Sequence, residues 1–351
     1  MDISQLLGIN PNDSCILCGQ ICSLTQLEQL GWEEFNNLVH IQNPPYRLVR
    51  YYRYNDHSIN NLTDGTVYLN DTERFDDCFD CAVDLEYDKF CVQRLKQYCK
   101  YFDIEDDGLA IEELPYKIAL KLYEYGNEQK AIEAIDNTLD ERQKLTIQNF
   151  ILFVFVAVKQ SEDWVPAIVD EIQNEYKEFV DMFKHFKMTC FTTSPYLNRM
   201  WATNDSKGFC VEYEIDYKSE LYMNLFPVIY SQKRNDFLPL SLNSDKKTSI
   251  FDLWQIYFNG LLRKSLHWAD QNEWRLIQYE SDKKAKNIPF FKAKKIYLGN
   301  KMKTEERRTI IAICKEKEIP YVGIVRKANS FDLVDCNANC EDCKNLLSKP
   351  L

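Results

Sequence analysis

Arg53 lies in a Tyr-rich run, Tyr51-Tyr52-Arg53-Tyr54, whose composition is typical of a β-strand. Alternation along a strand places Tyr51 and Arg53 on one face and Tyr52 and Tyr54 on the other. A guanidinium on a concave sheet face is suited to binding a phosphate or a carboxylate. The alternative is that Arg53 pairs with a nearby acid on a solvated face, and the sequence leaves both interpretations open.

A carboxylate and a guanidinium stand two residues apart in the later run Glu273-Trp274-Arg275-Leu276-Ile277. Strand alternation predicts that Glu273 and Arg275 share a face. On an exposed face they form an ordinary ion pair that contributes little to stability. In a cleft the same carboxylate is placed to hydrogen-bond a ribose or to act as a base. We therefore take Glu273 as the candidate catalytic residue and Arg275 as a candidate binding residue.

Three hydroxyl side chains end the strand-like run that precedes Pro195, and Met200-Trp201 follows shortly after. Hydroxyls at a strand end either line a binding site or cap the turn that follows. The candidate binding residues of this segment are Thr192, Thr193, Ser194 and Trp201, together with Tyr54 of the first motif.

The 13 cysteines are spread over the whole chain, and three groups have close spacing. These groups are Cys15-x2-Cys18-x3-Cys22, Cys78-x2-Cys81 and Cys336-x3-Cys340-x2-Cys343. A Cys-x2-Cys turn supplies two of the four tetrahedral ligands that zinc requires. If the two ends of the chain meet, one zinc site is predicted from Cys15, Cys18, Cys340 and Cys343. The alternative is that these residues are free thiols.

The elements that must position these residues follow from the hydrophobic pattern. We expect a Cys-bearing lead and helix at 1–45, a first strand segment at 46–84, a helical block at about 85–187, a strand-rich core at 188–330 and a Cys-bearing tail at 331–351. Helices are also expected at 249–268 and at 304–317, the latter with Thr304 as its N-cap. The sum predicts an α+β fold, with a mixed, largely antiparallel sheet and the helical block packed beside it.

The order of the motifs resembles a bacterial domain-of-unknown-function family, number two-nine-seven-one. The matching pieces lie at about 46–81 and 188–300. They are the Tyr-Arg-Tyr strand, Tyr68-Leu69-Asn70, the Phe75 to Cys81 run, Met200-Trp201, Lys207-Gly208-Phe209-Cys210-Val211-Glu212-Tyr213, Glu273 to Ile277 and Ile296-Tyr297-Leu298-Gly299. The family usually continues after Met-Trp with Ser-His-Tyr-Ala, whereas this chain has Ala202-Thr203-Asn204-Asp205-Ser206. Any role of that His and Tyr therefore cannot be transferred.

The order of an Arg strand, a Ser/Thr strand and a late Glu strand is also similar to the ADP-ribosyltransferase fold. That resemblance implies that Arg53 binds NAD, that Thr192, Thr193 and Ser194 support the site, and that Glu273 promotes loss of nicotinamide. A carboxylate is well suited to stabilising an oxocarbenium-like transition state. The expectation is an NAD-dependent ADP-ribosyltransferase-like enzyme, of the kind used as a toxin or in phage defence, with a protein target.

Composition limits the remaining alternatives. The net charge is −11, so a nucleic-acid partner is not favoured. The short apolar run Phe150 to Val158 cannot span a bilayer. The beginning of the sequence carries no signal-peptide pattern, so we expect a cytoplasmic protein. A non-catalytic module that binds a nucleotide or a protein stays open, as does an enzyme acting on nucleic acid.

Overall fold

The computed structural model describes residues 13–72, 87–106, 108–135, 139, 141–203, 205–232, 260–280 and 284–336, and it confirms the α+β class. The chain divides into two compact units. A strand unit takes in Met1–Ala82, Lys184–Arg234 and Leu261–Leu351, and a helical unit takes in Val83–Phe183 and Asn235–Gly260. Within the described residues, no helix combines the length and the apolar composition needed to cross a membrane.

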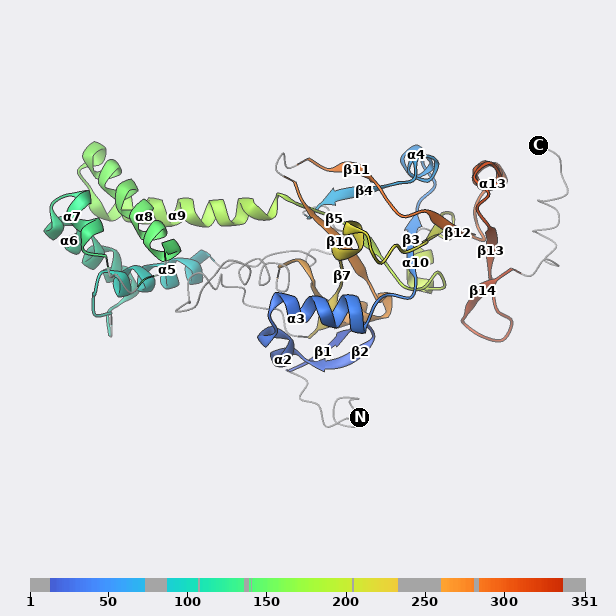
Figure 1. Ribbon diagram of the computed structural model, residues 1–351, viewed down its shortest axis with the longest axis horizontal. Coiled ribbons are helices and arrows are strands. Elements are labelled where there is room, and N and C mark those ends of the chain that lie inside the picture. The colour runs from blue at the N-terminus through green and yellow to red at the C-terminus, as the bar shows by residue number, and fades with distance from the viewer. Residues whose placement is uncertain are drawn as a thin grey trace. The chain divides into compact units, whose positions relative to one another are not determined.

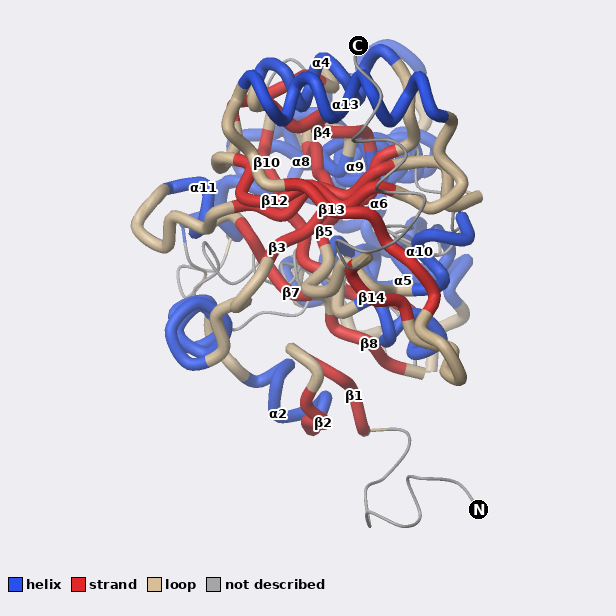
Figure 2. Tube along the Cα trace, turned by 90° about the vertical axis from the view of Figure 1, so that its right-hand side faces the viewer, coloured by secondary structure: helices blue, strands red, loops and turns tan. Residues whose placement is uncertain are grey.

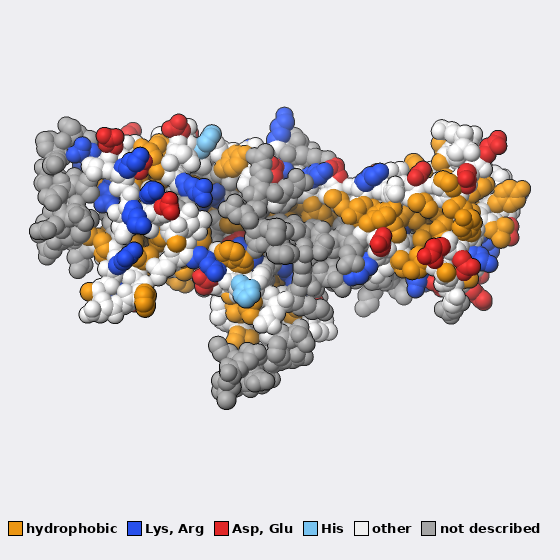
Figure 3. Space-filling model, turned by 180° about the vertical axis from the view of Figure 1, so that it is seen from behind, with side chains coloured by type: hydrophobic (Ala, Val, Ile, Leu, Met, Phe, Trp, Pro, Cys, Tyr) orange, Lys and Arg blue, Asp and Glu red, His pale blue; other side chains and the backbone are white. Residues whose placement is uncertain are grey.

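The predicted helical block is confirmed as a group of helices (Figure 1). In the described residues these are α5 (Tyr87–Tyr101), the 3₁₀-helix η3 (Ile111–Glu113), α6 (Leu114–Tyr125), α7 (Glu128–Glu133), α8 (Glu141–Ser161) and α9 (Trp164–Phe183). Helix α6 shows the amphipathic spacing: Ile118 and Leu122, four residues apart, are fully buried, whereas Leu120 is 55% exposed. Figure 3 shows further apolar side chains at the surface of this unit.

A buried polar network ties α5 to α9 inside the helical unit. The Glu175 carboxylate accepts a hydrogen bond from Arg94 Nε at 2.5 Å and another from the Tyr98 hydroxyl. Arg94 Nη1 also donates to Gln97 Oε1 at 2.8 Å. A buried charge is tolerated when it is paired and hydrogen-bonded, as Glu175 is here.

The described residues of the strand unit form three sheets where the sequence predicted one. Their strand orders are β2-β1-β8-β9, β11-β4-β5-β10-β7 and β14-β13-β12-β6-β3. The pairings are antiparallel except for β12–β13 and β8–β9, which are parallel, so the largely antiparallel character is confirmed. The strands are β1 (Ser14–Leu17), β2 (Gln20–Ser23), β3 (Leu48–Tyr52), β4 (Thr66–Asp71), β5 (Phe186–Phe191), β6 (Phe209–Tyr213), β7 (Leu225–Pro227), β8 (Ile229–Ser231), β9 (Arg263–Ser265), β10 (Trp274–Tyr279), β11 (Lys286–Pro289), β12 (Ala293–Leu298), β13 (Tyr321–Arg326) and β14 (Leu333–Asp335).

Helices cover the β3 sheet on one face, where α4 and α13 lie over the strands (Figure 2). Alternation along β6 directs Phe209 and Val211 into the same apolar cluster as Leu62 of α4 and Ile310 of α13. The opposite face buries Cys210 of β6 together with Trp201 of α10. Because both faces are covered, every residue of β6 is buried.

Shorter helices connect these strands. They are α2 (Leu24–Gln29), α3 (Trp32–Asn36), the π-helix η1 (Asn37–Gln42), α4 (Asp56–Asp64), α10 (Asn198–Thr203), α11 (Glu220–Met223), the 3₁₀-helix η6 (Leu266–Gln271) and α13 (Thr304–Glu316). The helix predicted at 304–317 is present, but its N-cap is Lys303, not Thr304.

Three parts of the chain differ from the sequence expectation. The polar N-terminal lead contains a β-hairpin, β1–β2, in which Leu17 pairs with Gln20 across the two-residue loop Cys18-Gly19. Both loop residues have positive φ, 51° and 77°, as a type I′ turn requires. The helix predicted at 249–268 is interrupted in its described part, because Arg263–Ser265 is a strand that pairs with β8. The predicted C-terminal tail likewise begins with β14.

Candidate functional site

Strand β5 forms a fork with two different strands along one of its edges. Strand β10 pairs with one edge of β5 over its whole length. On the other edge, β4 pairs with β5 at Asn70↔Met188, whereas β3 forms a bridge at Val49↔Thr192. The stretch from Thr189 to Phe191 therefore lies between the two points at which β4 and β3 join β5.

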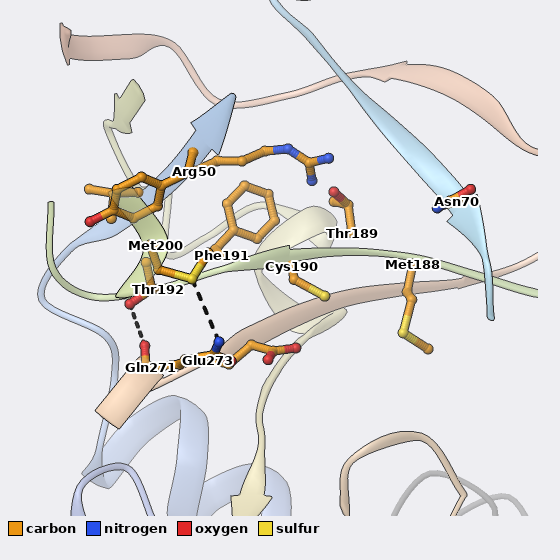
Figure 4. Close-up of a pocket in the computed structure, with 12 residues that line it drawn as sticks. Arg50, Asn70, Met188, Thr189, Cys190, Phe191, Thr192, Met200, Gln271 and Glu273 are labelled. Carbon is orange, nitrogen blue, oxygen red and sulfur yellow. Dashed lines mark hydrogen bonds between the residues drawn. The ribbon is translucent and has the colours of Figure 1, made fainter. Parts of the chain in front are cut away.

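A cavity of about 230 Å³ lies at this fork, which we call the fork cavity. It is lined from five parts of the strand unit: Arg50 of β3, Asn70 of β4, Thr189 of β5, Met200 of α10 and Glu273 immediately before β10. Figure 4 shows these side chains around β5. The cavity thus gathers a cation, an anion, an amide and a hydroxyl from segments that are distant in sequence.

The guanidinium of Arg50 points toward Thr189 in the fork cavity (Figure 4). It lies 5.2 Å from the ring centre of Tyr52 and 5.9 Å from that of Phe191, both cation–π distances. Its Nε and Nη1 are buried and have no hydrogen-bond partner among the described residues, and the same is true of Thr189 Oγ1. Buried donors are normally paired, so these atoms are the unusual feature of the cavity.

Glu273 lines the fork cavity, and both oxygens of its carboxylate are already paired with cations. It is 5% exposed, and its two oxygens accept from Arg275 Nε at 2.7 Å and from Lys264 Nζ at 2.6 Å. Burial by itself raises the pKa of the Glu273 carboxyl, but the Arg275 and Lys264 cations outweigh burial and hold the pKa well below its usual range. The side chain is therefore a fixed negative charge at neutral pH and not a proton donor.

Hydrogen bonds hold this charged group rigidly. The Glu273 backbone N–H donates to the Tyr230 hydroxyl at 2.8 Å, and Arg275 Nη1 donates to the Leu261 carbonyl at 2.5 Å. Arg275 is completely buried. The prediction that Glu273 and Arg275 share a strand face is confirmed by their ion pair.

Of the residues that the sequence singled out, Glu273 and Thr192 line the fork cavity. Thr192 Oγ1 donates to the Gln271 carbonyl, so its hydroxyl holds the segment before β10 in place. Thr193 is buried at 8% exposure but does not line the cavity. Arg275 acts behind the cavity, through its ion pair with Glu273.

The remaining predicted residues lie outside the cavity lining. Arg53 is exposed beyond the end of β3, where its carbonyl accepts from Ser58 Oγ at 2.6 Å at the start of α4. Tyr54 is partly buried against the large apolar cluster. The Ser194 carbonyl accepts from the Tyr51 hydroxyl at 2.9 Å. Trp201 is a core residue, 3% exposed, whose Nε1 donates to the Pro195 carbonyl at 2.8 Å.

Arg50, which the sequence did not single out, supplies the cavity's guanidinium. Arg53 lies between two tyrosines in the sequence, but β3 ends at Tyr52, so Arg53 is not part of the strand. In the structure, Arg50 directly follows the fully buried Leu48 and Val49 within one strand. A charged residue in so buried a strand needs a partner or a function.

The predicted zinc site is only half within the described residues, because Cys340 and Cys343 lie outside them. Cys15 is buried in β1 and Cys18 occupies the hairpin turn, and burial raises the pKa of both thiols to about 12. Zinc binds the thiolate form, so both thiols would have to lose their protons on binding. In the part of the chain that the structure describes, no group of three or more His, Cys, Asp or Glu residues is arranged to hold a metal. Zinc shared between the chain ends stays a prediction.

Comparisons with known proteins add no relative: no family model, no curated protein and no solved structure matches this chain.

Proposed function

We propose that this chain binds a nucleotide in the fork cavity, with NAD as the first candidate. The observation that supports the proposal is the convergence of Arg50, Thr192 and Glu273 on one cavity within one compact unit. Arginine is the side chain best suited to a phosphate, and a buried carboxylate is suited to a ribose hydroxyl. In this proposal Arg50 takes the role that the resemblance to the ADP-ribosyltransferase fold gave to Arg53.

The size of the cavity limits which part of the ligand is enclosed. Ligand pockets in proteins commonly measure about 300–1,000 Å³. The fork cavity, at about 230 Å³, is smaller than most of them. It suits one phosphate-bearing end of a dinucleotide, or a mononucleotide of which part stays outside.

A second candidate is catalysis, namely ADP-ribosyl transfer from NAD to a protein target. The observation that favours it is the position of the Glu273 carboxylate in the cavity lining, since a negatively charged carboxylate can stabilise an oxocarbenium-like transition state. Both oxygens of Glu273 are engaged by Lys264 and Arg275. Direct contact with a ribose therefore requires that one of these ion pairs opens or that its oxygen accepts a further hydrogen bond.

Calorimetric titration with NAD, AMP and adenosine tests the first proposal. We expect NAD and AMP to bind and adenosine, which lacks phosphate, to bind at least tenfold more weakly, because hydrogen bonds to charged groups are the strong ones. Equal affinity for all three, or no binding of any, would contradict it.

Release of nicotinamide from NAD tests the catalytic candidate. We expect the wild-type chain to release nicotinamide and Glu273→Gln to lose this activity. Near-UV circular dichroism must show that the variant is folded. NAD binding without nicotinamide release, with or without added protein targets, leaves the binding module as the function.

A further inference from the structure

The Arg50 side of the fork cavity is built for a negatively charged oxygen group. We infer that Arg50 and Thr189 form an oxyanion subsite, which takes a phosphate group. This inference rests on the proposed function in one respect only, that the phosphate belongs to a nucleotide. The subsite itself predicts affinity for inorganic phosphate as well.

Buried polar atoms of Arg50 and Thr189 that have no hydrogen-bond partner among the described residues support the subsite. Nε and Nη1 of Arg50 are two donors of one charged group, and both are buried without a hydrogen-bond partner among the described residues. Thr189 is 2% exposed, and its Oγ1 also has no partner there. Leaving charged donors unsatisfied in a protein interior is costly, so a site that keeps them in this state is expected to gain a partner from a ligand.

Two aromatic rings beside the Arg50 guanidinium also support the subsite. Tyr52 and Phe191 hold the guanidinium through their ring faces, which stabilise the cation without using its N–H groups. The Tyr52 hydroxyl is itself engaged with the Tyr213 hydroxyl at 2.8 Å. Arg50 is thus fixed in position while its donors stay available, which is the preorganisation that an anion site needs.

The position of Glu273, the one carboxylate among the described residues of the cavity lining, also supports the subsite. Arg275 lies opposite Cys190 in the β5–β10 register, so Glu273 and Arg275 share the face of Cys190. Thr189 and Phe191 alternate with Cys190 and point to the other face. Figure 4 shows Arg50 and Thr189 on one side of β5 and Glu273 on the other. Glu273 therefore does not neutralise Arg50, and its own charge is balanced by Lys264 and Arg275.

The two sides together give the bound ligand a direction. The phosphate lies at Arg50 and Thr189, and the uncharged part extends through the fork between β3 and β4 toward Glu273. A hydroxyl-bearing group such as a ribose is the part that suits the carboxylate side.

Calorimetric titration with inorganic phosphate, on the full chain and three variants, tests the subsite. Arg50→Gln should weaken phosphate binding at least tenfold and Thr189→Val by about threefold, because each removes a donor to a charged group. Arg53→Gln is the matched control: it removes an equal charge three residues later, outside the cavity lining, and should leave the affinity unchanged. Sulfate should compete with phosphate.

Stability supplies a readout that separates a ligand site from a structural role. If Arg50 serves the fold, Arg50→Gln lowers the urea midpoint in phosphate-free buffer. If Arg50 serves a ligand, the midpoint stays the same or rises, and the wild-type chain alone gains stability when phosphate is added. A lowered midpoint combined with unchanged phosphate affinity overturns the subsite.

The binding measurements distinguish a failure of the subsite from a failure of the proposed function. Phosphate binding that depends on Arg50, without binding of NAD or AMP, supports the subsite and contradicts the nucleotide proposal. Nucleotide binding that neither phosphate nor Arg50→Gln affects supports the nucleotide proposal and overturns the subsite. An affinity that is equal in the wild type and Arg50→Gln, for every ligand, also overturns the subsite.

Discussion

Glu273 shows how one buried carboxylate can organise a site at the scale of single residues. Its two oxygens bind two different cations, Lys264 and Arg275, and all three side chains are almost completely enclosed. Lys264 also donates to Gln271 Oε1 at 3.1 Å and lies 5.3 Å from the Trp268 ring centre. Removing the carboxylate would leave two buried cations without their main partner.

The depressed pKa of Glu273 gives a prediction with a definite sign. A carboxyl whose folded-state pKa is lowered stabilises the fold fully above its unfolded pKa, and this stability is lost as the pH falls. For Glu273 the loss begins below about pH 4.5, the ordinary value. Glu273→Gln should lower the free energy of unfolding at pH 7 by about 3 kcal/mol or more. The difference from the wild type should shrink below pH 4.5. Urea unfolding at a series of pH values measures this.

The carboxylate of Glu280, which is 14% exposed and pairs with a lysine at the surface, is the control for that measurement. Its ion pair with Lys286, which is 46% exposed, spans 2.6 Å. Glu280→Gln should change the free energy of unfolding by less than about 1 kcal/mol. Parallel stability curves for the wild type and Glu273→Gln across the acid range would contradict the role assigned to Glu273.

At the scale of elements, two glycines set how closely strands and turns approach beside the site. A Cβ added at Gly208 would lie 1.9 Å from the Tyr52 carbonyl oxygen, and one at Gly299 would lie 2.3 Å from that of Ser206. Gly208 therefore fixes the end of β3 against β6, two residues beyond Arg50. The close approach of the Tyr52 carbonyl therefore explains the glycine of the Lys207-Gly208 motif.

Substituting Gly208 with alanine should disturb both stability and the site. We expect Gly208→Ala to lower the free energy of unfolding by about 1–3 kcal/mol, because the contacted atom is backbone and β3 must shift. Phosphate affinity should fall with it, since Arg50 moves with β3. Gly31→Ala is the control, because its Cβ would meet only the flexible Glu34 carboxylate at 3.1 Å. Urea unfolding and calorimetry measure the two effects, and unchanged values for Gly208→Ala would contradict this account.

Elements with a strong periodic pattern could be predicted from the sequence, and elements set by tertiary pairing could not. Strands β3, β5 and β10 and helix α13 lie where the alternation or the helical spacing placed them. The β1–β2 hairpin was missed because Cys18-Gly19 is not a common turn pair and its cysteines suggested metal. Strand β9 was missed because only three residues, Arg263–Ser265, pair with β8.

The candidate site could likewise be predicted only in part from the sequence. Glu273 and Thr192 could be found because they end or begin well-patterned strands. Arg50 could not be separated from Arg53 by composition, since the choice depends on where β3 ends and on the fork between β3 and β4. Lys264 was also missed, because its segment was expected to be helical.

At the scale of the whole molecule, the two units use different means of stabilisation. The helical unit relies on amphipathic helices and on the Arg94–Glu175 pair between α5 and α9. The strand unit joins sheets at β5, and the fork cavity exists because β4 and β3 part from the same edge of that strand. The site lies entirely within the strand unit.

The most direct test of the account is a crystal structure of the chain with NAD bound at a saturating concentration established by calorimetry. We expect nucleotide density in the fork cavity, with a phosphate oxygen within hydrogen-bond distance of Arg50 Nε and a ribose on the Glu273 side of β5. A nucleotide bound elsewhere on the chain, with the fork cavity free of it, would contradict the account.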